Sequence, residues 1–234
     1  MTARDVVDRA ALAGRLEKVV TRMRAAAERA GRDPAAVTLV AVSKAFPSDV
    51  ILEGIGAGLT DFGENRAQEL RAKVATIDAR ARWHFVGHLQ TNKVRHVVGS
   101  VALVHSVDRS GVAEAIARRA RSLGIVQEVL IEVNVAGERT KYGVAPDEAV
   151  ALATDADALD GVRVRGLMTM PPPARDPEQV RSNFRTVAEL HRIVLQRVPR
   201  AGELSMGMSG DFDVAIEEGA TIVRVGEAIF GPRR

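Results

Sequence analysis

The chain has 234 residues, 46% of them hydrophobic and only 3% aromatic, which predicts one sizeable aliphatic core at the size where α/β barrels stay single domains. It has no cysteine, which excludes disulfides, thiolate catalysis and cysteine-ligated zinc or iron–sulfur clusters, and which fits a reducing cytoplasm. The formal net charge is only +3 because 30 acidic residues are interspersed with 33 basic ones, so charged clusters are interpreted mainly as solvated faces.

Two basic clusters, Arg118-Arg119-Ala-Arg121 and Arg71-Ala-Lys73, lie on predicted helices and accompany no exposed aromatics or recognisable nucleic-acid module. Nucleic-acid binding is therefore only a weak alternative.

The N-terminal segment is charged throughout, unlike the apolar core of a signal peptide, and no apolar run is long enough to span a bilayer. We expect a soluble, cytoplasmic protein that binds neither nucleic acid nor membrane.

The first predicted element is an amphipathic helix over residues 4–30. Apolar residues recur there at helical spacing, and Gly31 ends the pattern. We expect a single domain over 1–234, with the N-terminal helix within 1–31 and the other elements within 37–234.

After this helix, short apolar strands alternate regularly with helical segments. The strands are predicted at 37–43, 60–63, 83–87, 102–106, 127–135, 162–168, 203–206 and 221–225. Helical patterns lie between them near 48–58, 64–76, 91–98, 109–123, 146–157, 177–198 and 210–218, with a final turn near 227–231. Eight right-handed βαβ units close a barrel, so we predict a single α/β fold, a (β/α)8 TIM-type barrel with an added N-terminal helix. A doubly wound open sheet is the alternative, weakened because no Gly-x-Gly-x-x-Gly follows the first strand.

Lys44 closes the first strand, a valine-rich run that is predicted to be buried on both faces. A charged amine at the lip of such a strand is costly unless it is paired or neutral. Burial or a nearby cation lowers the pKa of a lysine, and the neutral amine is the form that attacks a carbonyl to make a Schiff base. Lys44 is therefore a candidate reactive amine. The alternative is that its stem packs along the strand while the ammonium reaches water.

Several other strands also end in polar residues, at the end where a barrel places its chemistry. These residues are Glu64, Asn65 and Arg66 after strand two, His84, His88 and Lys93 around strand three, His105 and Asp108 around strand four, and Asn134, Lys141 and Tyr142 after strand five.

The loops after strands seven and eight are rich in small residues. They consist of Ser205-Met206-Gly207-Met208-Ser209-Gly210-Asp211 and Arg224-Val225-Gly226-Glu227-Ala228. Small residues permit close backbone approach, and hydroxyls and the N–H groups of a following helix donate hydrogen bonds to an anion. In barrels these two loops frequently bind phosphate. A lysine and a phosphate site at one barrel mouth suit pyridoxal 5′-phosphate (PLP), whose aldehyde needs an amine and whose phosphate needs an anion site.

Arg224 lies in an otherwise apolar strand and is expected to point at the same space. An arginine beside the pyridine nitrogen disfavours protonation of that nitrogen and weakens the ring as an electron sink. The cofactor would then be bound but only mildly activated. The alternative is a salt bridge from Arg224 to Glu217, Glu218 or Glu227.

These motifs together resemble the pyridoxal phosphate homeostasis protein family. The resemblance covers nearly the whole chain, and several independent motifs occur in order. They are residues 39–44, 62–65, 83–87, 89–90, 92–93, 166–168, 205–209, 224–226 and 229–231. The resemblance implies a fold-type III PLP barrel related to the N-terminal domain of alanine racemase.

The resemblance also implies roles for individual residues. Lys44 is implied as the Schiff-base lysine, with Asn65 near the cofactor ring and Arg224 at the pyridine nitrogen. The residues implied around the phosphate are Ser205, Met206, Gly226 and Glu227, the last through its backbone, with Ser209 as an additional donor. Lys141 matches a family lysine that is expected to hold or pass on the aldehyde, as a second PLP site, whereas His88 is assigned no role because the family motif varies there.

A racemase of the alanine racemase type also needs a second acid or base on the opposite face of the cofactor, commonly a tyrosine from a second domain. The only tyrosine, Tyr142, lies in a turn, where a packing role is as well supported as a position near the cofactor. His84 and His105 are expected to be hydrogen-bonded core or rim residues rather than proton carriers. We therefore assign no catalytic residue and no metal, and predict a carrier or buffer of PLP that contributes to intracellular PLP homeostasis and delivers PLP to apo-enzymes. An amino-acid racemase or related weak PLP enzyme is the alternative. Without a second domain, a monomer is the default expectation.

Overall fold

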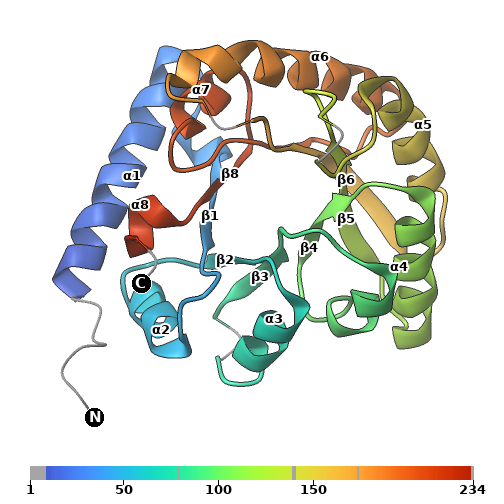
Figure 1. The fold of residues 1–234 in the computed structure, drawn as a ribbon, viewed down its shortest axis with the longest axis horizontal. Helices are drawn as coiled ribbons and strands as arrows, with labels where there is room; N and C mark the ends of the chain where they lie inside the picture. Colours follow the sequence, from blue (N-terminus) through green and yellow to red (C-terminus); the bar gives the residue numbers. More distant parts are fainter. Residues whose placement is uncertain (1–8, 78–79, 139–140, 173, 233–234) are drawn as a thin grey trace.

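The computed structural model describes residues 9–77, 80–138, 141–172 and 174–232. Within them, eight parallel strands close into a barrel in chain order, which confirms the predicted (β/α)8 fold (Figure 1). Each strand ends within two residues of its predicted bounds. The strands are β1 (Thr38–Val42), β2 (Asp61–Glu64), β3 (Arg82–Phe85), β4 (Leu103–Val107), β5 (Gln127–Val133), β6 (Val162–Thr169), β7 (Glu203–Ser205) and β8 (Ile222–Val225).

Helices alternate with the strands as expected. They are α1 (Arg9–Arg29), α2 (Ser48–Gly56), α3 (Ala67–Val74), α4 (Ser110–Leu123), α5 (Pro146–Asp157), α6 (Arg181–Arg197), α7 (Phe212–Glu217) and α8 (Glu227–Phe230), with 3-10 helices η1 (Pro34–Ala36), η2 (Thr91–His96) and η3 (Pro177–Val180). The first residues of the predicted N-terminal helix fall within 1–8, outside the described residues. No described helix is both long and apolar enough to cross a membrane.

The helix expected over 91–98 is the one clear difference in secondary structure. It forms the short 3-10 helix η2, in which Val94 alone is buried. An α-helix in a globular protein is held by an apolar stripe that recurs over several turns, whereas the buried residues of this segment, Val94, Val97 and Val98, span little more than one turn.

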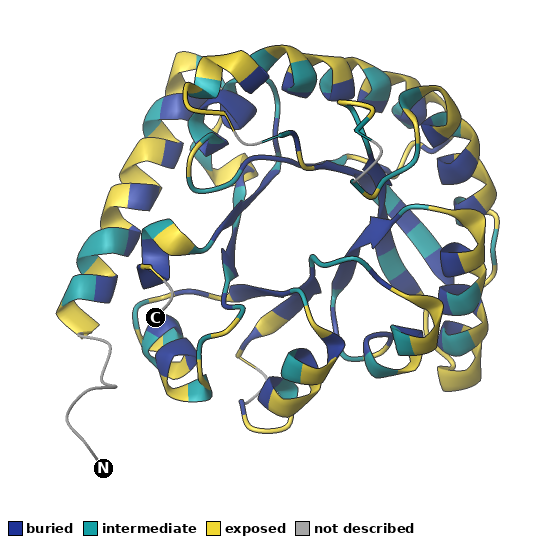
Figure 2. Cartoon of the chain, viewed as in Figure 1, coloured by how far each residue is buried: buried dark blue, intermediate teal, exposed yellow. Residues whose placement is uncertain are grey.

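Successive strand residues face the barrel interior and the surrounding helices in turn. The large apolar cluster lies between strands and helices, and Figure 2 shows buried residues along the strands and on the inner faces of the helices. A separate small cluster fills the interior, made of Val40, Leu103, Leu130, Met168 and Ile222. Beyond this layer, the interior also holds buried polar side chains, among them His84, His105, Ser205 and Arg224.

Helix α1 packs against α7 and α8 on the outside of the barrel (Figure 1). Its buried stripe includes Leu12, Leu16 and Val19. Arg15 Nε donates a hydrogen bond to the Ile229 carbonyl at 2.6 Å. The helix therefore covers the side of the barrel where β1 and β8 meet, directly behind the loop that follows β8.

Gly166 permits a close approach between β6 and β7. Its φ of +149° is a conformation that side chains disfavour, and it lies at the register shift between β5 and β6. A Cβ at this position would lie 1.7 Å from the carbonyl oxygen of Glu203. Only glycine fits here without moving the β7 backbone.

We expect Gly166→Ala to destabilise the fold by at least about 2 kcal/mol, because the added methyl group must displace that backbone. Gly202→Ala is the matched control, since a Cβ at Gly202 meets no atom within 4 Å. Urea unfolding followed by far-UV circular dichroism measures both variants. Equal unfolding midpoints would refute the steric requirement at Gly166.

Candidate functional site

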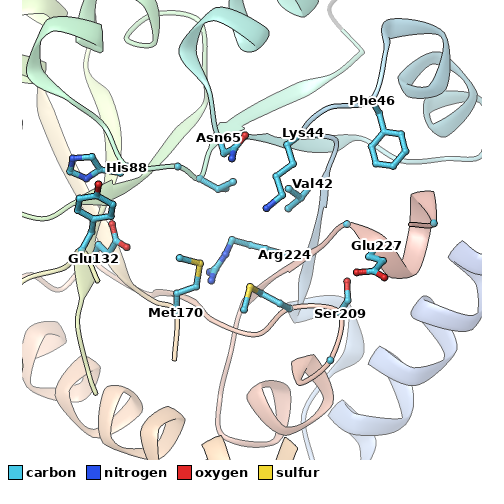
Figure 3. A pocket seen from close by; sticks show the side chains of 17 residues that line it. Val42, Lys44, Phe46, Asn65, His88, Glu132, Met170, Ser209, Arg224 and Glu227 are labelled. Atoms are coloured by element: carbon cyan, nitrogen blue, oxygen red, sulfur yellow. The ribbon is translucent and has the colours of Figure 1, made fainter. Parts of the chain in front are cut away.

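The C-terminal ends of the strands surround a cavity of about 440 Å³ (Figure 3). Small-molecule sites commonly have volumes of roughly 300–1,000 Å³. The cavity is lined by Val42, Lys44, Phe46, Asn65, Val86, Gly87, His88, Glu132, Tyr142, Met170, Met208, Ser209, Gly210, Arg224, Gly226, Glu227 and Gly231. It is therefore the place where the predicted site should lie.

Lys44 points into this cavity from the end of β1 (Figure 3). The next residue, Ala45, has a φ of 65°, which is uncommon for a residue with a side chain, and its N–H donates to Glu69 Oε2 at 2.9 Å. The N–H of Phe46 donates to the Ser43 carbonyl at 3.0 Å. This tight turn ends the strand at the lysine and fixes the backbone on either side of it.

A buried ion pair supports the same turn from the helix side of β1. Lys73 Nζ donates to Glu64 Oε1 at 2.6 Å and to the Ser43 carbonyl at 2.8 Å, and the Ser43 hydroxyl donates to Glu64 Oε1 at 2.6 Å. Burial raises the pKa of Glu64, and its hydrogen bond with Lys73 opposes that shift. The prediction that Lys73 belongs to a solvated face is wrong: it shares the inward stripe of α3 with Leu70, where the buried Glu64 needs a cation.

Arg224 projects from β8 into the barrel and is only 4% exposed. Its Nη1 donates to Ser205 Oγ at 2.5 Å, and its Nη2 donates to the Thr169 carbonyl at 2.9 Å. The alternative of a salt bridge to Glu217 or Glu218 does not hold, because those two carboxylates pair with arginines of α1 and α6. Burial lowers the pKa of Arg224 to about 10, so the guanidinium remains charged at neutral pH.

From Ser205, a line of hydrogen bonds crosses the barrel interior toward the N-terminal ends of the strands. Ser205 Oγ lies 2.9 Å from His105 Nδ1, and His105 Nε2 lies 2.9 Å from His84 Nδ1. His84 Nε2 in turn lies 2.9 Å from Asp61 Oδ1. All five side chains, from Arg224 to Asp61, belong to buried residues. We call them the interior chain.

When both imidazoles are neutral, all hydrogen bonds of the interior chain are donated in the same direction, toward Asp61. Burial holds the pKa of His105 well below its usual value, which keeps that ring neutral. For Asp61, burial raises the pKa, but hydrogen bonds with His84 and Thr60 outweigh it and leave the pKa below its usual value. The ionised Asp61 can only accept, so His84 donates to it, His105 donates to His84, Ser205 donates to His105, and Arg224 donates to Ser205.

The structure brings six of the predicted cofactor residues together at the cavity: Lys44, Asn65, Ser209, Arg224, Gly226 and Glu227. Ser205 lies outside the lining and contacts Arg224 from within the barrel. Met206 belongs to the helix-facing cluster, because neighbouring residues at the end of β7 point to opposite sides. Lys141 also lies outside the lining, although the next residue, Tyr142, is part of it.

Between the loops that follow β7 and β8, the cavity wall has the features of an anion site. Ser209 Oγ accepts a hydrogen bond from the Ala228 N–H at 3.3 Å, which ties the two loops together. A Cβ at Gly226 would lie 3.0 Å from the Val42 carbonyl oxygen, so the space beside this residue favours glycine. Backbone groups and the Ser209 hydroxyl are therefore available to a phosphate at this end of the cavity, beside the side chains of Met208 and Glu227.

The wall across the cavity from Lys44 holds residues to which the sequence assigned no role (Figure 3). Glu132 projects into the cavity from β5, and the rings of His88 and Tyr142 stack with centroids 3.6 Å apart at an angle of 11°. His88 Nδ1 lies 3.3 Å from Asp108 Oδ2, within ion-pair distance but without hydrogen-bond geometry. Strand alternation offered a signal for Glu132, since it is a charged residue two positions after an interior-facing leucine.

Glu132 has an unusual proton affinity. Burial, and then repulsion from Asp108, raise the pKa of Glu132 to about 7, while the charge of Arg224 opposes the shift. A group with this pKa can give or take a proton near neutral pH. Across the described ranges, no three or more histidine and acidic side chains gather closely enough to hold a metal ion.

Comparison with known families gives a consistent result. Residues 15–234 match the family model of the alanine racemase N-terminal domain. The chain is 49% identical over 223 residues to the pyridoxal phosphate homeostasis protein of Aquifex aeolicus (strain VF5), covering 94% of this chain and 97% of that protein. It is 43% identical over 224 residues to the protein of the same name from Pseudomonas aeruginosa, covering 95% of this chain and 96% of that protein.

Solved structures are similar over nearly the whole chain. PipY of Synechococcus elongatus PCC7942, solved with PLP bound, has a TM-score of 0.82 and 34% identity, covering 94% of this chain and 100% of that one. Alanine racemase from Corynebacterium glutamicum has a TM-score of 0.67 and 15% identity, covering 92% of this chain and 60% of that one. The second likeness concerns the fold alone.

We expect Ser205→Ala to destabilise the protein by about 2–4 kcal/mol, because it leaves buried nitrogens of Arg224 and His105 without a partner. Ser106→Ala is the control: Ser106 is equally buried, but its Oγ has no hydrogen-bond partner among the described residues. That variant should be as stable as the parent or more so. Urea unfolding compares the two, and equal losses would contradict the role of the interior chain.

Glu132 should make the stability of the protein depend on pH. Its pKa rises from the usual 4.5 in the unfolded chain to about 7 in the folded protein. Its contribution to the free energy of unfolding is therefore fully present below pH 4.5 and is lost as the pH rises through 7. Glu132→Gln stays neutral, and we expect its stability relative to the parent to grow by on the order of 2–3 kcal/mol between pH 5 and pH 8. Thermal and urea unfolding at both pH values measure this, with the exposed Glu114→Gln as control. A constant difference would show that Glu132 is ionised throughout.

Proposed function

The chain belongs to the family of pyridoxal phosphate homeostasis proteins and carries the barrel of the alanine racemase N-terminal domain, and from this premise we propose that it binds PLP at the barrel mouth. The observation that carries the proposal is the meeting of Lys44 and the buried Arg224 in one cavity beside two small-residue loops. An amine, a fixed cation and an anion site suit the aldehyde, the pyridine ring and the phosphate of PLP. The similar protein PipY has been solved with PLP bound.

Lys44 is the proposed attachment point. Its amine condenses with the aldehyde of PLP to form a Schiff base, with loss of one water. Asn65 lines the cavity at the end of β2 and is the proposed neighbour of the ring. Arg224 is the proposed neighbour of the pyridine nitrogen, where a charged guanidinium held by the interior chain disfavours a proton on that nitrogen.

The proposed phosphate site lies between the loops that follow β7 and β8. Ser209 contributes its hydroxyl, and Gly226 and Glu227 contribute backbone groups. Ser205 acts through Arg224 in this proposal, since it lies outside the lining of the cavity, and Met206 contributes backbone alone. Lys141, next to the cavity-lining Tyr142, is the proposed second PLP site.

The proposed role is that of a carrier or buffer in PLP homeostasis, without turnover of an amino acid. A Schiff base suits this role, because another amine can replace Lys44 by direct exchange and so pass PLP to an apo-enzyme. We also propose that the chain works as one domain and as a monomer. We further propose that it works in the cytoplasm, for which its lack of cysteine is the supporting observation.

A second candidate is a weak amino-acid racemase. It is favoured by the titratable wall across from Lys44, where Glu132 has a pKa of about 7 and Tyr142 stacks on His88. A racemase requires an acid or base on each side of the cofactor, and this wall would supply the second one.

We expect PLP to give the purified protein a near-visible absorption band that Lys44→Ala abolishes, because the band requires the Schiff base. Lys141→Ala should keep the band, since Lys141 lies outside the cavity lining. D- and L-alanine are then added in heavy water, and the Cα position is followed by NMR. No deuterium in alanine supports the carrier, deuterium incorporation supports the racemase, and no absorption band would end the PLP proposal.

A further inference from the structure

The wall across the cavity from Lys44 has a binding capacity of its own (Figure 3). Its central group is Glu132, which is 5% exposed, lines the cavity, and has a buried Oε2 without a hydrogen-bond partner among the described residues. Unpartnered buried carboxylate oxygens are rare because desolvation is costly unless a donor replaces the lost water. A ligand that fills the cavity can supply that donor.

The charges around Glu132 select the sign of the ligand. Asp108, at the end of β4, is close enough to raise the pKa of Glu132 by repulsion, after burial as the main cause. Arg224 opposes this effect but forms its hydrogen bonds with Ser205 and Thr169, and Glu132 enters no ion pair in the described part of the chain. A cation placed at Glu132 would satisfy the orphaned oxygen and relieve the repulsion between the two carboxylates.

The neighbouring rings select the shape of the ligand. His88 and Tyr142 stack face to face and both line the cavity, and Asp108 lies beside His88. Together they form a flat side wall next to the carboxylate, against which short methylene groups can pack. The combination of an acceptor with no donor and a flat apolar surface suits a small alkylammonium group.

We propose that Glu132, His88 and Tyr142 form a subsite for the primary ammonium group of an incoming amine, with Glu132 as its hydrogen-bond and proton acceptor. This rests on the proposed function and deepens it, because it assigns the group that displaces Lys44. The ammonium gives one proton to Glu132, and the neutral nitrogen then forms a bond to the carbon held by Lys44. The two remaining protons of the incoming nitrogen pass to the Lys44 nitrogen as the bond from that carbon to Lys44 breaks. Lys44 leaves as a neutral amine, and neither water nor an oxidant is consumed.

The single tyrosine of the chain provides a direct test of binding. Protein without PLP is labelled with ring-¹³C tyrosine, so that Tyr142 gives the only labelled signal, and is titrated with propylammonium at pH 8. We expect a saturable shift of this signal, and 1-propanol, which has the same shape without the charge, should produce none. A lack of any saturable shift with propylammonium overturns the subsite.

Two variants distinguish the subsite from a general effect of charge. Glu132→Gln should weaken propylammonium binding by about tenfold or more, because it removes a charged hydrogen-bond acceptor. Glu138→Gln makes the same change of charge in the loop after β5, outside the cavity lining, and should leave the affinity unchanged. Equal weakening by both variants would overturn the assignment of Glu132.

The last measurement uses the protein loaded with PLP. Propylamine, L-alanine and Nα-acetyl-lysine are added in turn. At timed intervals the Schiff bases are reduced with borohydride, and mass spectrometry measures how much PLP is still attached to Lys44. We expect saturation with at least one amine, and a rate that Glu132→Gln lowers about tenfold or more. Alanine as the best amine indicates an amino acid as acceptor, and Nα-acetyl-lysine indicates a lysine side chain. An unchanged rate in Glu132→Gln overturns the subsite. If PLP gives the parent no absorption band before any amine is added, the proposed function is refuted, whereas the titration with propylammonium is unaffected.

Discussion

A permanently charged guanidinium inside a barrel is the constraint around which this molecule is organised. Arg224 is buried, and its removal from water is offset by two hydrogen bonds and by the nearby carboxylates of Glu132 and Asp211. One nitrogen binds the Thr169 carbonyl and another binds Ser205, from which the interior chain leads to the ionised Asp61. The polar core of the barrel is thus a means of holding one cation at the base of the cavity.

At the mouth of the barrel, the two basic side chains lie on the side opposite Glu132 and Asp108. Lys44 and Arg224 lie on one side with the loops that follow β7 and β8, whereas Glu132 and Asp108 lie on the other. The buried pair of Glu64 and Lys73 stays outside this arrangement and holds the backbone before Lys44. The site therefore has an end suited to an anion and an end suited to a cation, and the two ends are built on different strands.

The fold was predictable because its signal is repeated: eight apolar runs alternate with helical patterns, and an error in one run does not alter the topology. The cavity was predictable where a strand ends in a residue of unusual type, as with Lys44 and Arg224. Side-chain direction was harder, since Ser205 and Met206 are adjacent in sequence but face the interior and the helices respectively. Glu132 was missed because it lies within a strand. The burial of Lys73 was missed because its partner Glu64, nine residues earlier, lies on β2, and the direction of both side chains depends on how α3 packs.

The interior chain also connects the two ends of the barrel through one continuous series of hydrogen bonds. When both imidazoles are neutral, each is an acceptor on one nitrogen and a donor on the other, so no single hydrogen bond in the chain can reverse without the others. With a proton on Asp61, both imidazoles would have to adopt their other tautomer. The reversal would stop at Ser205, whose oxygen can accept hydrogen bonds from His105 and Arg224 together. While both imidazoles are neutral, the directions of these hydrogen bonds are therefore coupled, from Asp61 at the closed end of the barrel to Ser205 beneath the cavity at its open end.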